Sequence, residues 1–129
     1  MNIQELETIH REGLPIKIFV LNNRVLGKIS ETQYLYHENR LMATAKSGGY
    51  TVPDFQRIAE AYGIRAVALA SGEELEAYAE WMVDSSPCLI EIPLPEESFL
   101  TPKIKFETGM IYPKLEDTDF AYVKEILKR

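Results

Sequence analysis

Two adjacent asparagines, Asn22 and Asn23, follow an apolar run, and Gly27 comes shortly after them. The run, Ile16 to Leu21, is typical of a fully buried strand. In an open α/β sheet, ligands bind beyond the carboxyl ends of the strands, where the next helix also points its free N–H groups. Amide and carbonyl oxygens are hard ligands suited to Mg²⁺ or Ca²⁺, which usually takes further ligands from phosphates. The pattern therefore indicates a metal or phosphate site, with an ordinary asparagine turn as the alternative.

The elements that would position this corner alternate between helix and strand. The predicted elements are a helix over 2–13, a strand over 16–21, a helix over 26–38, a helix over 51–62, a strand over 64–69, a helix over 71–82 and a strand over 88–92. The order α-β-α-α-β-α-β predicts an α/β domain whose parallel sheet carries helices on both faces. Because three short strands make a narrow sheet, we expect an exposed apolar flank that favours association.

Local spacing predicts two helix starts. Thr51 is expected to be the N-cap of one helix with Asp54 three residues later, and Ser71 with Glu74 repeats this capping box. Apolar residues at i, i+3, i+4 and i+7 then predict the core-facing stripes, which are Phe55, Ile58, Ala59 and Tyr62 in the first helix and Leu75, Tyr78, Ala79 and Met82 in the second.

The pattern changes at Pro93, after which prolines punctuate a stretch without clear periodicity. We therefore predict an α/β domain over residues 1–93 and an irregular tail over 94–129 that extends from the same domain. A last short helix is expected from Asp119 to Lys128.

Composition excludes several classes of function. The net charge of −6 argues against nucleic-acid and anionic membrane surfaces. Cys88 is the only cysteine, which rules out an intramolecular disulfide and a cysteine-based zinc site, and we expect it to be a buried structural thiol. No apolar stretch approaches the ~20 residues that span a bilayer, and the segment from Met1 to Glu5 lacks the features of a signal peptide. These properties predict a cytoplasmic protein.

Several segments resemble the C-terminal cofactor-binding domain of thiamine-diphosphate enzymes, in particular the acetolactate synthase group. The similarity lies in Met1 to Thr8, Leu14-Pro15, Asn22-Asn23 with Leu26-Gly27, Pro53-Asp54-Phe55 and Ala61-Tyr62-Gly63, and it continues to Leu115-Glu116-Asp117. It implies a partial thiamine-diphosphate-binding, Rossmann-like domain.

The resemblance also implies roles for the residues of the corner. The Asn23 side chain and the Val25 backbone carbonyl match two ligands of Mg²⁺ in that family. Leu26, Gly27 and Lys28 fall where the family's backbone meets the cofactor diphosphate. At Lys28 the synthases usually have methionine, so this lysine contacts an anionic group or is simply solvated.

Thr32 and Gln33 correspond to the substrate side of the family's site. Thr32 stands where the synthases have a tryptophan that favours larger acceptor 2-keto acids. The family's Gly-Asp-Gly-Ser turn, which supplies the aspartate ligand of Mg²⁺, would fall before Met1. The family's glutamate that activates the cofactor lies in a separate pyrimidine-binding domain, so the resemblance implies no catalytic residue within this chain.

These observations predict the C-terminal fragment of a thiamine-diphosphate- and Mg²⁺-dependent enzyme, inactive alone. The complete enzyme would decarboxylate a 2-keto acid and transfer the two-carbon unit to a carbonyl acceptor. The expected partners are the rest of that enzyme or another subunit, within a homo-oligomer. The alternative is a non-catalytic α/β interaction module that has lost the cofactor chemistry. A flavodoxin-like nucleotide-binding regulator is disfavoured because no phosphate loop follows a first strand.

Overall fold

The computed structural model describes residues 2–99, 103–104 and 111–112. The chain forms two compact units, Met1–Ser98 and Phe99–Arg129. The first unit contains a three-stranded parallel sheet in the order β1-β3-β2. Its strands are β1 (Lys17–Asn22), β2 (Arg65–Ala68) and β3 (Cys88–Pro93). Cys88 of the central strand is level with Lys17 on one side and Arg65 on the other.

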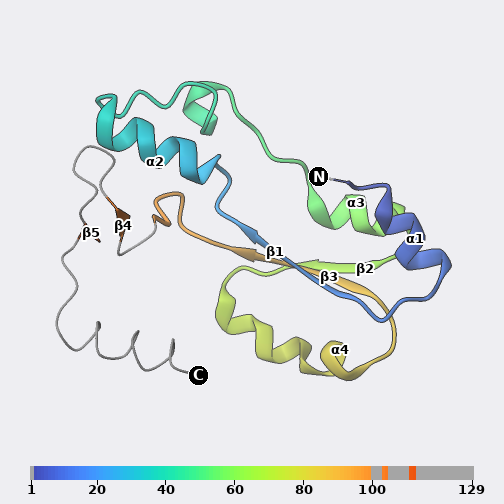
Figure 1. Cartoon of the computed structure of the whole chain (residues 1–129). Helices are drawn as coiled ribbons and strands as arrows, with labels where there is room; N and C mark the ends of the chain where they lie inside the picture. Colours follow the sequence, from blue (N-terminus) through green and yellow to red (C-terminus); the bar gives the residue numbers. More distant parts are fainter. Residues whose placement is uncertain (1, 100–102, 105–110, 113–129) are drawn as a thin grey trace, which may run out of the picture. The chain divides into compact units, whose positions relative to one another are not determined.

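The predicted order of helices and strands is confirmed. The helices are α1 (Glu5–Arg11), α2 (Gly27–Tyr36), α3 (Phe55–Ala61) and α4 (Ala79–Val83), with 3₁₀ turns η1 (Lys46–Gly48) and η2 (Gly72–Tyr78). Helices α1 and α3 lie on one face of the sheet, and η2 with α4 lies on the other (Figure 1). The fold class is therefore the predicted parallel α/β domain with helices on both faces.

Alternation along β3 divides the core between the two faces of the sheet. Leu89 points toward α1 and α3 and packs with Ala59 and Ile64. Cys88 and Ile90 point the other way, toward the apolar side of η2 and α4. Cys88 is completely buried, which agrees with the predicted structural thiol.

Strand β1 lies at an edge of the sheet and is only half covered. Ile18 and Val20 pack into the core beneath α1 and α3. Phe19 and Leu21, on the opposite face, remain 45% and 63% exposed. The described residues therefore cover these two side chains only in part, as expected for a narrow sheet.

The predicted start of α3 is wrong by one turn. Its N-cap is Asp54, whose carboxylate accepts a hydrogen bond of 2.9 Å from the N–H group of Arg57. Thr51 cannot begin the helix because Val52 precedes Pro53, and a residue before proline avoids helical backbone angles. The stripe itself is partly confirmed, since Phe55 and Ala59 face the core.

The second predicted capping box is also wrong. Residues Gly72–Tyr78 form a 3₁₀ helix, and the side chain of Ser71 makes no capping hydrogen bond. The Glu74 carboxylate accepts a 2.8 Å hydrogen bond from the N–H group of Ala70, so it ties down the preceding loop. Of the predicted stripe, Leu75, Tyr78 and Met82 pack against the sheet, whereas Ala79 is exposed.

The second unit contains a short antiparallel pair of strands, β4 (Lys103–Ile104) and β5 (Ile111–Tyr112). The tail, expected to be irregular up to Asp119, therefore contains strand at these four residues. The predicted helix from Asp119 to Lys128 lies outside the described residues. Within the described part of the chain, no helix has the length and apolar character needed to cross a membrane.

A charged cluster fastens the amino ends of the strands to the loop after α4. The Lys17 ammonium donates to the carbonyls of Asp84 and Ser86, at 2.6 Å and 2.5 Å. The guanidinium of Arg65 forms an ion pair of 2.8 Å with the Asp84 carboxylate. It also lies 4.5 Å from the centre of the Trp81 ring, which stacks on this cation.

This cluster predicts an acid-sensitive contribution to stability. Hydrogen bonds from Ser86 and the positive charge of Arg65 lower the pKa of Asp84 below its ordinary value of 3.8. A lowered folded-state pKa stabilises the fold above that ordinary value, and the contribution is lost as the pH falls through the folded-state pKa. We expect Asp84→Asn to lower the melting temperature near neutral pH, with a difference that shrinks in acid.

Thermal unfolding, followed by circular dichroism from neutral pH down to below the pKa of the Asp84 carboxylate, measures this difference in melting temperature. Glu73→Gln, on the exposed side of η2, is the matched carboxylate control and should leave the melting temperature unchanged. A deficit for Asp84→Asn that is equally large below the pKa of the carboxylate would contradict the prediction.

Candidate functional site

The connection from β1 to α2 is a tight loop shaped by two asparagine side chains. The Asn22 side-chain oxygen accepts a 2.8 Å hydrogen bond from the N–H group of Arg24. The Asn23 side-chain oxygen accepts a 3.3 Å bond from the N–H group of Val25. Such bonds, in which an asparagine oxygen accepts from the backbone N–H group two residues on, stabilise turns. They accompany a left-handed Arg24, with φ of 59°, which is unusual for a residue other than glycine.

Strand β3 holds this loop from beneath. The side-chain nitrogen of Asn22 donates to the Glu91 carboxylate at 2.6 Å, and the Asn22 side chain is buried. The backbone carbonyl of Asn22 accepts a 2.9 Å hydrogen bond from the N–H group of Leu94. Sequence reasoning missed Glu91 as a member of this site. Its signal is a single carboxylate within the apolar run from Cys88 to Ile92.

The N-terminus of α2 is open. Leu26 is the N-cap, no side chain caps the helix, and its first turn contains no acidic residue. Among the described residues, nothing accepts a hydrogen bond from the N–H groups of Gly27 and Lys28. The helix dipole adds partial positive charge at this end. Uncapped N–H groups and this dipole suit an anion such as a diphosphate.

Asn23 lies directly beside this helix start. A Cβ atom at Gly27 would come within 2.7 Å of the side-chain nitrogen of Asn23. Glycine therefore leaves the room in which the Asn23 amide sits. The structure thus brings together the predicted residues Asn23, Val25, Leu26, Gly27 and Lys28.

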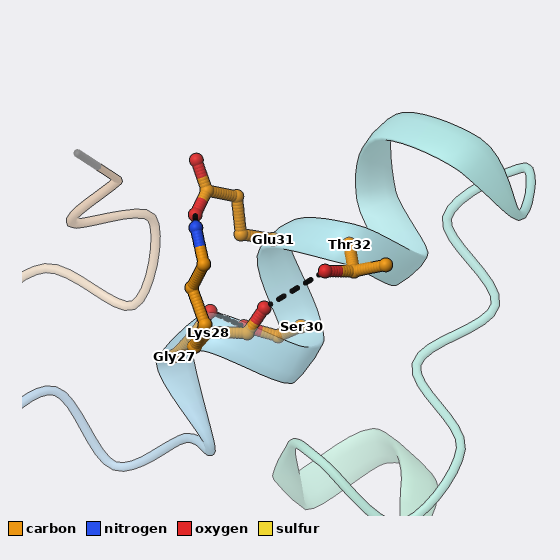
Figure 2. Close-up of polar contacts among 5 residues, drawn as sticks. All are labelled: Gly27, Lys28, Ser30, Glu31 and Thr32. Carbon is orange, nitrogen blue, oxygen red and sulfur yellow. Dashed lines mark hydrogen bonds and ion pairs between the residues drawn. The ribbon is translucent and has the colours of Figure 1, made fainter. Parts of the chain in front are cut away.

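Polar side chains occupy the next turn of α2 (Figure 2). The Lys28 ammonium pairs with the Glu31 carboxylate at 3.0 Å, although the lysine side chain is 73% exposed and the glutamate only 4%. The Ser30 hydroxyl donates to the carbonyl of Gly27, and the Thr32 hydroxyl donates to the carbonyl of Lys28. Lys28 is therefore partly neutralised by its own helix. The Thr32 hydroxyl is on the exposed surface.

Gln33 attaches a second segment to α2. Its side-chain nitrogen donates to the carbonyl of Met42 at 3.2 Å, and its side-chain oxygen accepts from the Thr44 hydroxyl at 2.6 Å. The carbonyl of Thr44 in turn accepts from the N–H group of Leu26 at 2.8 Å. Both ends of the Gln33 amide are thus hydrogen-bonded to residues of the segment after α2, while the neighbouring Thr32 remains exposed.

No group of three histidine, cysteine, aspartate or glutamate residues that could hold a metal occurs among the described residues. A cation at this loop would have to rely on amide and carbonyl oxygens and on oxygens of its ligand. The Val25 carbonyl accepts no hydrogen bond from the described part of the chain, although Val25 itself is buried. These donors fit a hard divalent cation carried by a phosphate group.

The protein family described as "Thiamine pyrophosphate enzyme, C-terminal TPP binding domain" matches residues 1–92. The chain belongs to this family. Probable acetolactate synthase 2, chloroplastic, of Oryza sativa subsp. japonica is 34% identical over an alignment of 111 residues that covers 81% of this chain and 17% of that protein. The acetolactate synthase isozyme 2 large subunit of Escherichia coli (strain K12) is 34% identical over 97 residues, 74% of this chain and 17% of that protein.

A solved structure supports the same family. The Rhodococcus jostii RHA1 thiamine diphosphate-dependent 4-hydroxybenzoylformate decarboxylase matches with a TM-score of 0.62 and 26% identity. The match covers 74% of this chain and 18% of that chain. The family member described here therefore spans less than a fifth of these relatives.

Substitution of Gly27 tests whether the Asn23 amide depends on this glycine. We expect Gly27→Ala to displace the Asn23 side chain, because the added Cβ would lie 2.7 Å from its nitrogen. The fold should not suffer, since alanine is a better helix former than glycine by about 1 kcal/mol. The Asn23 side-chain NH₂ signals in a two-dimensional NMR spectrum report the displacement without any ligand.

Gly72→Ala provides the matched control, because a Cβ there meets only the Ile92 side chain at an ordinary 3.9 Å. It should leave the Asn23 signals in place. Unchanged Asn23 signals in Gly27→Ala would show that the amide does not depend on the space left by Gly27.

Proposed function

We propose that this chain is the C-terminal, cofactor-binding part of a thiamine-diphosphate- and Mg²⁺-dependent enzyme of the acetolactate synthase type. The observation that carries the proposal is the Asn23 amide beside the uncapped N-terminus of α2. Family membership and the acetolactate synthase relatives support the same assignment.

In this proposal, the loop after β1 binds a cation and a diphosphate through different residues. The Asn23 side-chain oxygen and the Val25 carbonyl bind Mg²⁺. The backbone of Leu26, Gly27 and Lys28 faces the diphosphate, which the helix dipole attracts. Asn23 can release its bond to Val25 at little cost, because 3.3 Å is near the limit for a hydrogen bond.

When bound, thiamine diphosphate supplies the chemistry for decarboxylation of a 2-keto acid and for transfer of the two-carbon unit to a carbonyl acceptor. The residues of this chain bind and orient the cofactor. Thr32 and Gln33 are proposed for the substrate side. The exposure of Thr32 supports direct contact, whereas the bonds of Gln33 to Met42 and Thr44 support a role in holding that segment.

The proposal includes a partner, either the rest of the enzyme or another subunit of a homo-oligomer. Two exposed apolar surfaces support it. On β1 these are Phe19 and Leu21, and on α2 they include Ile29 and Tyr36, which are 52% and 45% exposed. The buried residues of α2 are the polar Ser30 and Glu31, so its apolar side chains face outward. We propose that the chain alone is inactive, because it needs the partner that covers these apolar surfaces.

A non-catalytic interaction module is the second candidate. It is favoured by the lack of any acidic or histidine cluster for a metal among the described residues. Such a module would keep the exposed apolar surfaces of β1 and α2 for its partner and would have no use for the cofactor.

Calorimetric titration of the chain with thiamine diphosphate separates the two candidates. We expect saturable binding in the presence of Mg²⁺, weaker by about tenfold or more when EDTA removes the metal. Thiamine without the diphosphate is the ligand control and should not bind, because it offers no anion to the N-terminus of α2. If the folded chain shows no Mg²⁺-dependent binding, the cofactor proposal fails and the interaction module is favoured.

A further inference from the structure

Glu91 is a carboxylate in the middle of the central strand, where charged groups are uncommon. It lies level with Val20 of β1 and Ala68 of β2. A partly buried carboxylate is stable only when hydrogen bonds replace its lost water. Its carboxylate receives the 2.6 Å bond from Asn22, and its backbone carbonyl receives a 2.9 Å bond from the N–H group of Leu69. The side chain is thus directed to the loop that carries Asn23.

The bond from Asn22 to Glu91 fixes the orientation of the Asn22 amide. An ionised carboxylate can only accept hydrogen bonds, so it selects the NH₂ end of the amide. The amide oxygen is then turned toward the N–H group of Arg24, which it binds at 2.8 Å. A flipped amide would oppose two oxygens at Glu91 and two donors at Arg24. The carboxylate therefore selects the arrangement in which the left-handed Arg24 is held.

Arg24 separates the two proposed metal-binding residues. Asn23 precedes it and Val25 follows it, so the backbone angles at Arg24 decide how the Asn23 side chain and the Val25 carbonyl are placed relative to each other. We propose that Glu91 is a positioning residue of the cation site, acting through Asn22 and Arg24. This inference rests on the proposed function for its metal, but the ordering of the loop by Glu91 is testable without it.

Three variants test the proposal in the full chain. Glu91→Met removes the acceptor and keeps the bulk of the side chain. Glu91→Gln retains an oxygen that can accept from Asn22 and should rescue the loop. Ile92→Ala is the control, because Ile92 is the next residue of the strand and packs on the other face with Cys88 and Ile90. This substitution should lower the stability of the fold and leave the hydrogen bonds of the loop after β1 unchanged.

The first measurement is hydrogen exchange without cofactor or metal. We expect the Arg24 N–H group to exchange about tenfold faster in Glu91→Met than in the unchanged chain, and close to the original rate in Glu91→Gln. The second is the affinity for thiamine diphosphate with Mg²⁺, which should fall about 10- to 100-fold in Glu91→Met, the range typical of groups that orient metal ligands. Ile92→Ala should change neither the exchange rate nor the affinity, even when it lowers stability as much as Glu91→Met does.

An unchanged Arg24 exchange rate in Glu91→Met overturns the proposal, as does an equal acceleration in Ile92→Ala. Faster exchange with unchanged Mg²⁺-dependent affinity also overturns it. If the unchanged chain binds no cofactor, the proposed function fails, while the exchange data still decide whether Glu91 orders the loop. Should Glu91→Met not fold, the unchanged chain provides the test, because the buried Asn22 side-chain amide must exchange more slowly than that of the exposed Asn39. Equal rates refute the proposal.

Discussion

Replacing Asn23 by alanine should abolish the Mg²⁺-dependent binding of thiamine diphosphate that we propose, and it should leave the fold nearly as stable as before. In the folded chain, the Asn23 side chain makes one long hydrogen bond, 3.3 Å from its oxygen to the N–H group of Val25. Its loss should lower the free energy of unfolding by about 1 kcal/mol at most. The same oxygen is a proposed ligand of the cation, and without it the affinity should fall by about 100-fold or more.

Calorimetric titration with thiamine diphosphate and Mg²⁺ measures this loss, and thermal unfolding of the same sample measures stability. Asn2→Ala, at an exposed asparagine ahead of α1, is the matched control and should preserve both quantities. Binding by Asn23→Ala with the affinity of the unchanged chain would exclude Asn23 as a ligand. A large loss of stability would instead show that the side chain serves the fold.

The architecture was predictable because its signals are local. The apolar runs that form β1 and β3 and the helix-forming stripe around Ala59 lie within a few residues of each other in the sequence. Such local patterns of hydrophobic residues predict helices and strands directly. The start of α3 was misplaced because the local rule for capping competes with another local rule, the effect of Pro53 on Val52. The steric effect of Pro53 on Val52 outweighs the capping preference of Thr51, so the helix begins after Asp54.

The candidate site was only partly predictable, because several of its contacts are long-range. Asn23 and Gly27 are close in sequence, and the strand-to-helix corner predicts both. Glu91 lies 69 positions from Asn22, and only the parallel pairing of β1 with β3 brings them together. The engagement of Gln33 by Thr44 likewise depends on how the segment after α2 folds back.

Truncation of Ile90 to alanine should produce a large loss of stability. Ile90 is completely buried in the central strand and packs with Leu69 and Cys88 beneath η2 and α4. Removing most of a buried isoleucine side chain costs about 2–5 kcal/mol through lost burial and the cavity left behind. In a unit of this size, that loss should lower the melting temperature by about 10 °C or more.

Urea unfolding measures the change in free energy, and Val83→Ala supplies the control because Val83 is 88% exposed at the end of α4. This control should change the free energy of unfolding by less than about 0.5 kcal/mol. Equal effects of the two substitutions would mean that the apolar layer between β3 and α4 contributes little to the fold. Because β3 also carries Glu91, we expect the proposed cation site to depend on this layer, which holds the strand in register with β1.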